Sequence, residues 1–394
     1  MSIYEGLSAD KLAVVLDLGA RYTKFGFIGE FAPRCIIPSE IKCPSSGKIR
    51  YIYSYTDEND LYSLLVEFVH MLFFKHVLVT PKDRHVVIVE SLLCPTLFRD
   101  TLAKVLYRHF EVASILFVPS HLVALCTLGV KTALVIDVGY EEVQIIPVYE
   151  GVPILKAWQA QPLAAKAIEA RLRNNFINAY NNMKNAAGDC GDTDTFAEDV
   201  SELPDSVIED IKVRGCFVTT MERSEMISKS EPVKEPPPLK YRIKGDKLIL
   251  IPGICRETAF EVLFERDNDT NSIQDLVLKS ILECGIDTRK QLAENLFLVG
   301  GTVMAPGFKS RFMREVKALL HSPEYCDRLP LNTVKLHNPP AKDNYTCWLG
   351  GAIFGATDML QMRSLSREKY LSLNTVPDWS NLAHNELVIS KLPT

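Results

Sequence analysis

The segment ALVIDVGYEEVQIIPVYEG, from Ala133 to Gly151, decides the fold class of this chain. Its pattern predicts an apolar strand that ends at Asp137, a turn through Val138 and Gly139, and a returning apolar strand. An Asp at the end of a buried strand, followed by a Gly turn, can direct one carboxylate and several backbone N–H groups at a phosphate–metal cluster. The segment therefore predicts part of a binding site for such a cluster.

A second copy of this pattern lies near the N-terminus, in LAVVLDLGARYTKFGFIGE, Leu12 to Glu30. Here the apolar strand ends at Asp17, Gly19 forms the turn, and a returning run follows. Two copies of one element predict two similar half-domains that face each other across a cleft. A third segment, NLFLVGGTVMAPGF from Asn295 to Phe308, ends a strand in a pair of glycines and predicts a further wall of that cleft.

Size and composition are those of an ordinary globular protein. The 394 residues are enough for two domains with separate cores, and 47% apolar with 24% charged residues is a usual balance. A net charge of −5 implies neither a nucleic-acid surface nor a membrane surface. The 10 Cys include no C-x-x-C pair, which argues against a zinc module or a disulfide framework and favours a reducing compartment. The longest apolar segment, Ile115 to Val130, contains Pro119 and predicts a strand and a helix, not a membrane span.

The three glycine-containing segments, in this order, resemble the two phosphate hairpins and the adenosine loop of the actin superfamily. Other phrases are similar to actin and the actin-related proteins: FAPRCIIPS from Phe31 to Ser39, PVYEG from Pro147 to Gly151, and CWLGGAIFGA from Cys347 to Ala356. The resemblance covers most of the chain. It implies the actin-like α/β fold, with two related lobes around a central cleft.

The same resemblance implies the domain boundaries. Residues 1–129 and 337–394 would form the first lobe, and residues 130–336 the second, with about 164–258 as its outer subdomain. Residues 39–59 would form a reduced version of the small subdomain 2 of the first lobe.

The family pattern implies a site for ATP or ADP with Mg²⁺. The positions that match this pattern are Asp17, Gly19, Lys24, Asp137, Gly139, Lys212, Gly300, Gly301 and Thr302. By resemblance, Asp17 and Asp137 would hold the metal through its waters, and Lys24 would reach the phosphates as a point charge. The alternative is that these residues are present only because the hairpin turns need them, so nucleotide binding stays open.

Several departures from the family pattern argue against hydrolysis. Val138 lacks a hydroxyl that the family has, and Glu141 replaces a glycine. A carboxylate about 4 Å from a phosphate charge costs about 4 kcal/mol at an effective dielectric constant near 20. Ser120 and Gln144 stand where the family has the Gln and His that position the attacking water, and Val213 replaces an acidic ribose contact. We therefore expect no catalytic residue and very slow or no hydrolysis of ATP.

Arg21 is a further departure, because the family has a small residue at this position of the first turn. One hypothesis is that Arg21 faces Glu141 across the cleft and replaces phosphate contacts with an ion pair. The other is that Arg21 is a solvated surface residue.

The segment from Ser39 to Asn59 is about half as long as in actin, where it builds a loop that inserts into the next filament subunit. A filament contact is heterologous, so each subunit needs a donor face and an acceptor face. A subunit without the donor loop would end the filament at its pointed end. The alternative is an ordinary deletion in a surface loop, which proteins tolerate well.

This combination resembles the subfamily of actin-related proteins at the pointed end of the dynactin filament. The phrases CGIDTRKQLAENLFLVGGT (Cys284 to Thr302) and NPPAKDNYTCWLGGAIFGA (Asn338 to Ala356) strengthen the resemblance. It implies two kinds of partner: a filament of actin-related subunits, bound through the barbed-end face, and other pointed-end dynactin subunits. It also implies a cytoplasmic, cytoskeletal protein in dynein-driven transport that does not polymerise with itself, spans no membrane and binds no nucleic acid.

Three other functions are consistent with the fold. An active actin-like ATPase would need the water-positioning pair and a full-length insert. A subunit of a chromatin-remodelling complex would often carry long inserts or a basic surface. A sugar-kinase-like phosphotransferase would need a catalytic Asp near the second turn and a sugar pocket, and neither can be placed in the sequence.

Local signals predict several individual elements. Ser272 and Asp275 predict a capping box at the start of a helix, and Ser120 is placed as the N-cap of another. CFVTTM, Cys216 to Met221, predicts a strand. Leu163 to Ala179 predicts a helix.

Three polar stretches predict surface segments. The acidic residues 181–199 predict a mobile loop. Residues 228–240 contain three consecutive prolines and predict a stiff surface linker. Trp379 is a candidate anchor for the polar tail.

Overall fold

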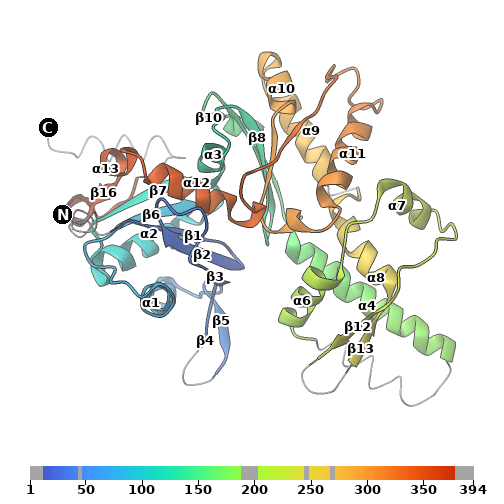
Figure 1. The fold of residues 1–394 in the computed structure, drawn as a ribbon, viewed down its shortest axis with the longest axis horizontal. Coiled ribbons are helices and arrows are strands. Elements are labelled where there is room, and N and C mark those ends of the chain that lie inside the picture. Colours follow the sequence, from blue (N-terminus) through green and yellow to red (C-terminus); the bar gives the residue numbers. More distant parts are fainter. Residues whose placement is uncertain (1–11, 43–46, 188–202, 244–247, 267–270, 378–394) are drawn as a thin grey trace, which may run out of the picture. The chain divides into compact units, whose positions relative to one another are not determined.

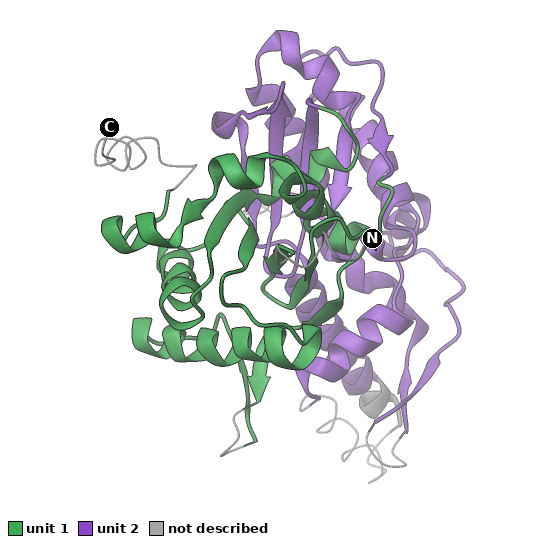
Figure 2. Cartoon of the chain, turned by 60° about the vertical axis from the view of Figure 1, so that its left-hand side comes forward, with its two compact units in different colours: residues 1–130, 339–394 green, residues 131–338 purple. Residues whose placement is uncertain are grey.

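The computed structural model describes residues 12–42, 47–187, 203–243, 248–266 and 271–377. The chain divides into two compact units: residues 1–130 with 339–394, and residues 131–338 (Figure 2). Each unit contains a mixed six-stranded sheet, which confirms the predicted α/β class. Within the described ranges, no helix combines the length and apolar character needed to cross a bilayer.

The sheet of the first unit has the strand order β16–β7–β6–β1–β2–β3 (Figure 1). Its strands are β1 (Val14–Leu18), β2 (Tyr22–Phe27), β3 (Cys35–Pro38), β6 (His85–Glu90), β7 (Ser114–Pro119) and β16 (Leu365–Ser366). Side chains alternate between the faces of a strand, so Val14 and Leu16 enter one core cluster while Ala13 and Val15 enter another. Both faces of this sheet are therefore buried.

Helices cover both faces of this sheet. They are α1 (Glu58–Met71), α2 (Thr96–Lys104), α3 (Ser120–Cys126), α12 (Thr346–Gly355), α13 (Met359–Arg363) and α14 (Arg367–Leu373). Trp348 of α12 is fully buried, and its indole N–H donates to the carbonyl oxygen of Val15 at 3.1 Å. A Cβ at Gly350 would lie 1.9 Å from the carbonyl oxygen of Val123, so only glycine lets α12 approach α3 this closely.

The segment between β3 and α1 forms a small ribbon. Strands β4 (Glu40–Lys42) and β5 (Ile49–Tyr51) pair antiparallel, with three residues in each strand. Ile41 and Ile52 are buried in the core of the first unit and anchor the ribbon there.

The sheet of the second unit has the order β10–β9–β8–β14–β15, with β11 paired to β9. Its strands are β8 (Ala133–Val138), β9 (Val143–Tyr149), β10 (Val152–Pro153), β11 (Gln159–Gln161), β14 (Leu296–Val299) and β15 (Leu336–His337). Strand β8 pairs antiparallel with β9 and parallel with β14, as β1 pairs with β2 and β6 in the first unit. The two Asp–Gly hairpins therefore occupy equivalent positions in the two sheets.

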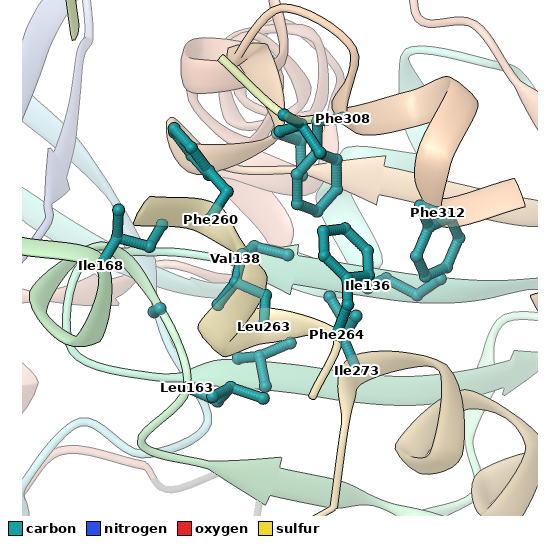
Figure 3. Packing of buried hydrophobic residues seen from close by; sticks show 14 of the residues in the cluster. Ile136, Val138, Leu163, Ile168, Phe260, Leu263, Phe264, Ile273, Phe308 and Phe312 are labelled. Carbon is teal, nitrogen blue, oxygen red and sulfur yellow. The ribbon is translucent and has the colours of Figure 1, made fainter. Parts of the chain in front are cut away.

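Seven α-helices and a second ribbon are described around this sheet. They are α4 (Ala165–Ala187), α6 (Asp205–Gly215), α7 (Met221–Ser228), α8 (Gly253–Thr258), α9 (Ile273–Glu283), α10 (Ile286–Ala293), α11 (Phe308–Leu320), β12 (Leu239–Arg242) and β13 (Leu248–Ile251). Figure 3 shows apolar side chains from α4, α9 and α11 around Ile136 and Val138 of β8. The ring of Phe308 lies 5.8 Å from that of Phe264 and 6.2 Å from that of Phe312, centroid to centroid.

Several local predictions can be compared with these elements. The capping box is confirmed, because Ser272 and Asp275 exchange side-chain and backbone hydrogen bonds at the start of α9. The helix predicted over 163–179 instead runs from Ala165 to Ala187, so the first part of the predicted loop is helical. The rest of that loop, and Trp379, lie outside the described residues.

Two local predictions were wrong. Cys216 to Thr220 is not a strand, since its backbone N–H groups donate to Arg256 and Pro306, which belong to no sheet, and Thr220 caps α7. Ser120 is not an N-cap: it is already helical and follows Pro119, which makes no side-chain bond.

The proline-rich segment crosses the surface of the second unit and is bound to it. Arg223 and Arg256 donate hydrogen bonds to the carbonyl oxygens of Lys234 and Pro237, each at 2.7 Å. Most of its residues are exposed, as expected of a surface linker.

Candidate nucleotide-binding site

In the first unit, the predicted nucleotide-binding residues lie at the β1–β2 turn. Asp17 is the penultimate residue of β1 and pairs in register with Lys24 of β2, and the Lys24 Nζ lies 3.2 Å from an Asp17 carboxylate oxygen. Both side chains are largely buried, at 13% and 15% exposed. A Cβ at Gly19 would lie 2.6 Å from the carbonyl oxygen of Tyr22, so the turn requires glycine. The structure thus brings together the three predicted residues of this hairpin.

The turn is held in place by residues next to the β4–β5 ribbon. The Ser39 hydroxyl donates to the carbonyl oxygen of Gly19 at 2.6 Å, and the Ser39 N–H donates to that of Arg21 at 2.9 Å. The Tyr53 hydroxyl donates to the carbonyl oxygen of Leu18 at 2.8 Å. Sequence reasoning missed Ser39 and Tyr53, because no spacing rule links residues so far apart.

Arg21 is buried, so the hypothesis that it is a solvated surface residue was wrong. Its guanidinium lies 5.1 Å from the ring centroid of Tyr51, and 8% of the residue is exposed. The stacking of the cation on the aromatic ring accounts for part of this burial. Glu141, its hypothetical partner, lies 2.9 Å from Lys166 of its own unit in an exposed ion pair.

In the second unit, the predicted residues Asp137, Gly139, Gly300 and Thr302 come together. Gly300 has a φ of +103°, and a Cβ there would lie 2.3 Å from the carbonyl oxygen of Val138 and 2.8 Å from Asp137 Oδ1. The Thr302 hydroxyl donates to the carbonyl oxygen of Gly139 at 2.7 Å. Gly301, with a φ of −70°, precedes the short 3₁₀ turn Thr302–Met304.

Lys212 of α6 takes part in a buried ion pair near this turn. Its Nζ lies 2.5 Å from a carboxylate oxygen of Glu169 in α4, and the two side chains are 11% and 9% exposed. The Tyr140 hydroxyl donates to the other Glu169 oxygen at 3.1 Å. Sequence reasoning missed Glu169; its only signal was its place in the first turns of the helix that follows the second hairpin. Val213, beside Lys212, is 67% exposed.

The two positions expected to orient an attacking water carry other groups. Ser120 begins α3, and the Gln144 amide donates to a Glu142 carboxylate oxygen at 3.0 Å. Burial raises the pKa of Glu142, with the hydrogen bond from Gln144 acting in the opposite direction. Neither Ser120 nor Gln144 can accept a proton as histidine does.

The fold itself requires glycine at two of the predicted positions. A Cβ at Gly19 or at Gly300 would collide with the carbonyl oxygen of Tyr22 or Val138, respectively. Asp17 and Asp137 are suited to holding Mg²⁺ through its waters. No group of three or more His, Cys, Asp or Glu that could bind a metal directly occurs in the described part of the chain.

In each sheet the first strand of an Asp–Gly hairpin pairs antiparallel with its returning strand and parallel with a later strand, and this repeated arrangement is that of the actin class of fold. The comparison with family models agrees: the actin model matches residues 8–372, and the chain belongs to the actin family. The chain is similar to Actin-related protein 10 of Dictyostelium discoideum. The two are 28% identical over 435 aligned residues, which cover 95% of this chain and 90% of that protein.

His121, next to Ser120, predicts a pH dependence of stability. It is 2% exposed, and burial lowers its pKa from 6.5 to about 4. Between these values the unfolded chain binds a proton that the folded chain does not, so stability falls as the pH falls. We expect His121 to lower the unfolding free energy by about 2 kcal/mol between pH 7 and pH 5. Urea titrations at pH 7 and pH 5 measure the free energy of unfolding of the wild type and of His121→Gln. The difference between the two proteins should change by this amount from one pH to the other. A difference that is the same at both pH values would contradict the prediction.

Proposed function

We propose that this chain is a non-catalytic actin-related subunit that caps the pointed end of the dynactin filament. It would bind the filament of actin-related subunits through its barbed-end face, dock the other pointed-end subunits, and so support dynein-driven transport in the cytoplasm. The two units would be the two actin-like lobes, 1–129 with 337–394 and 130–336. The similarity to an actin-related protein supports this proposal.

The observation that carries the proposal is the small size of the β4–β5 ribbon. Its strands have three residues each, and its base is fixed to α1. The Arg50 guanidinium contacts both Asp60 carboxylate oxygens, at 3.0 and 2.7 Å, and this hydrogen bonding lowers the pKa of Asp60 to about 2. The ring of Tyr53 stacks on that of Phe98 with centroids 4.5 Å apart. A filament subunit with so short a projection has no donor face for a further neighbour.

A nucleotide, if bound, would serve as a structural ligand in this proposal. ATP or ADP would contact the two turns through Gly19, Gly139, Gly300 and Gly301, with Lys24, Thr302 and Lys212 nearby and Mg²⁺ on the waters of Asp17 and Asp137. The residues at 120 and 144 cannot orient an attacking water as the family pair does, so we expect no phosphate release above background with Mg-ATP.

The capping function can be tested by fluorescence microscopy with the labelled chain and filaments of actin-related subunits. We expect one label on each filament, at the pointed end, and no further growth there. A chimera that carries the longer loop of actin between Lys42 and Ile49 serves as the matched control and should allow growth to continue. Labels within filaments or at both ends would rule out the proposal. Co-purification from cytosol with a chromatin-remodelling ATPase, and not with dynactin, would favour the rival function.

A further inference from the structure

The end of α1 carries an exposed apolar ridge that the capping function does not use. The helix continues as a π-helical turn from Leu72 to Val77, and Leu78 ends it. Leu78 is 77% exposed and Phe74 is 42% exposed. We call Phe74, Lys75, His76 and Leu78 the Phe74–Leu78 ridge.

Leu78 adopts a backbone conformation that does not suit leucine. Its φ is +58° and its ψ is 44°, the left-handed region that glycine favours. Six described residues other than glycine have a positive φ, and the other five are polar: Asp83, Glu111, Glu150, Ser230 and Asn374. Glycine would end the helix at position 78 without this strain. The folding of the chain therefore does not explain why an exposed leucine is present there.

The ridge stands on a rigid base. Phe73, in the same turn, is fully buried, with its ring edge-on to Phe25 at 4.9 Å and stacked with Phe110 at 6.4 Å. The Leu78 N–H donates to the carbonyl oxygen of Phe73, as does the N–H of Val79 at 3.0 Å. A side chain fixed in this way loses little conformational freedom when it enters a pocket.

The charges around the ridge are positive. Between Glu67 and Asp83 the sequence contains no carboxylate, while it contains His70, Lys75, His76 and Lys82. The ring of His70 lies 4.7 Å from that of Phe74, and Lys75 is exposed. Burial and the neighbouring Lys75 lower the pKa of His76, so its imidazole is neutral at pH 7. Lys82, further along, is paired with Glu111 at 2.8 Å. The ridge therefore offers an apolar centre beside the positive charge of Lys75.

We infer that the Phe74–Leu78 ridge is a docking surface for a protein that presents an apolar pocket rimmed by carboxylates. Charge complementarity selects such a partner, and the apolar anchor would supply most of the affinity. The inference rests on the proposed function in one respect: the partner is then one of the other pointed-end dynactin subunits, not a filament subunit. An anionic membrane is the less favoured occupant, because two exposed apolar side chains bury little area in a bilayer.

Biolayer interferometry with the immobilised chain and the purified pointed-end dynactin subunits tests this inference without filaments. We expect Leu78→Gly and Phe74→Ala each to weaken binding at least about 10-fold, as truncation of an interface anchor does. Leu78→Gly should also raise Tm by about 2–4 °C, because it relieves the left-handed strain. Loss of binding together with a gain in stability distinguishes a binding role from a structural one. Leu371→Ala, which removes an exposed leucine from α14 of the same unit, serves as the control and should change neither quantity.

Equal binding by wild type and Leu78→Gly would overturn the inference, as would the absence of binding by wild type. Binding of the wild-type chain to phosphatidylserine vesicles, lost in Leu78→Gly, would overturn it in favour of a membrane. The capping assay is independent of this measurement. A chain that binds the subunits through the ridge but fails to cap filaments would disprove the proposed function and leave the docking surface established.

Discussion

Gly300→Ala is expected to destabilise the second unit by about 4 kcal/mol, or to lower its Tm by about 10 °C. Two independent effects combine at this position. The φ of +103° lies outside the range that alanine adopts without strain, and the new Cβ would lie 2.3 Å from the carbonyl oxygen of Val138. That oxygen belongs to the backbone of β8, which is buried in the core and cannot move aside. Thermal unfolding followed by circular dichroism measures the shift.

Gly139→Ala is the matched control in the same unit. A Cβ at Gly139 would meet the carbonyl oxygen of Glu142 at 3.6 Å, an ordinary van der Waals contact. We expect this variant to stay within about 1 kcal/mol of wild type. Similar losses in both variants would show that glycine is needed throughout the site for another reason, and would refute the steric argument.

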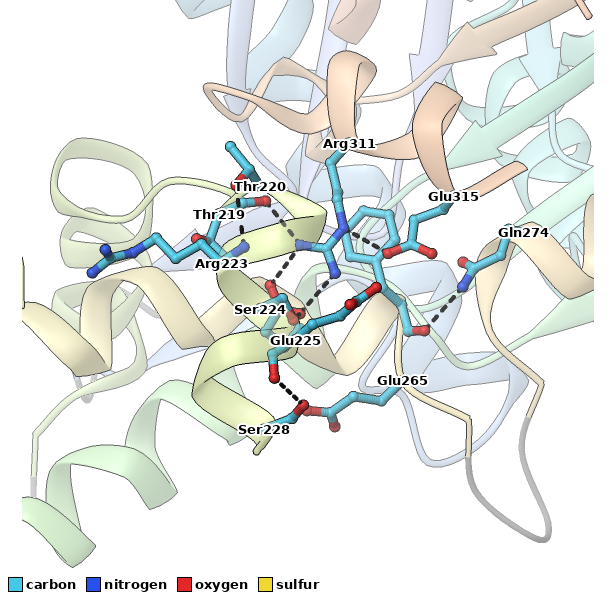
Figure 4. A network of polar contacts seen from close by, with 12 residues as sticks. Thr219, Thr220, Arg223, Ser224, Glu225, Ser228, Glu265, Gln274, Arg311 and Glu315 are labelled. Atoms are coloured by element: carbon cyan, nitrogen blue, oxygen red, sulfur yellow. Dashed lines mark hydrogen bonds and ion pairs between the residues drawn. The ribbon is translucent and has the colours of Figure 1, made fainter. Parts of the chain in front are cut away.

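Arg311→Met is expected to cost about 3–5 kcal/mol, because it breaks a buried charge network (Figure 4). The Arg311 guanidinium donates to a Glu261 carboxylate oxygen at 3.1 Å, to Glu315 at 2.6 Å and to the carbonyl oxygen of Thr219 at 2.9 Å. Burial raises the pKa of Glu261, while Ser224 and Arg311 oppose the shift. Without Arg311, this carboxylate would remain buried and would have to bind a proton. Urea unfolding at neutral pH measures the loss.

Arg314→Met on the same helix is the control. Arg314 pairs with Glu222, and both side chains are more than half exposed. Exposed pairs of this kind contribute about 0–1 kcal/mol. If Arg311→Met loses no more than Arg314→Met, the network around Arg311 does not stabilise the second unit.

The two hairpins were predictable because each is encoded locally. Apolar residues up to Asp17 and Asp137, followed by a glycine turn, need only strand periodicity and turn chemistry to be recognised. The steric need for glycine at position 19 agrees with that interpretation, whereas a Cβ at Gly139 would make only an ordinary contact. The resemblance to the actin family indicated how the segments assemble into one fold, and the match to the actin family model confirmed the family.

The neighbours of the candidate residues could not be predicted from sequence. Lys212 was selected by family position alone, yet its buried partner Glu169 lies 43 positions away, in another helix. The burial of Arg21 depends on Tyr51 from the ribbon, and nothing in the local sequence indicates that contact. Such pairs arise when distant elements pack together, so a periodicity rule cannot find them.

The construction of the first unit sets the order in which a nascent chain can mature. Strand β16 and helix α12, which complete its sheet and cover one face of it, come from residues beyond 339. All of the second unit leaves the ribosome before them. During translation, one apolar face of the amino-terminal hairpin therefore stays uncovered until the residues beyond 339 have been synthesised. By that time the whole sequence of the second unit is already available for folding. A premature stop codon near Pro339 would therefore destabilise the first unit more than the second unit, although the second unit lies closer to the stop in the sequence.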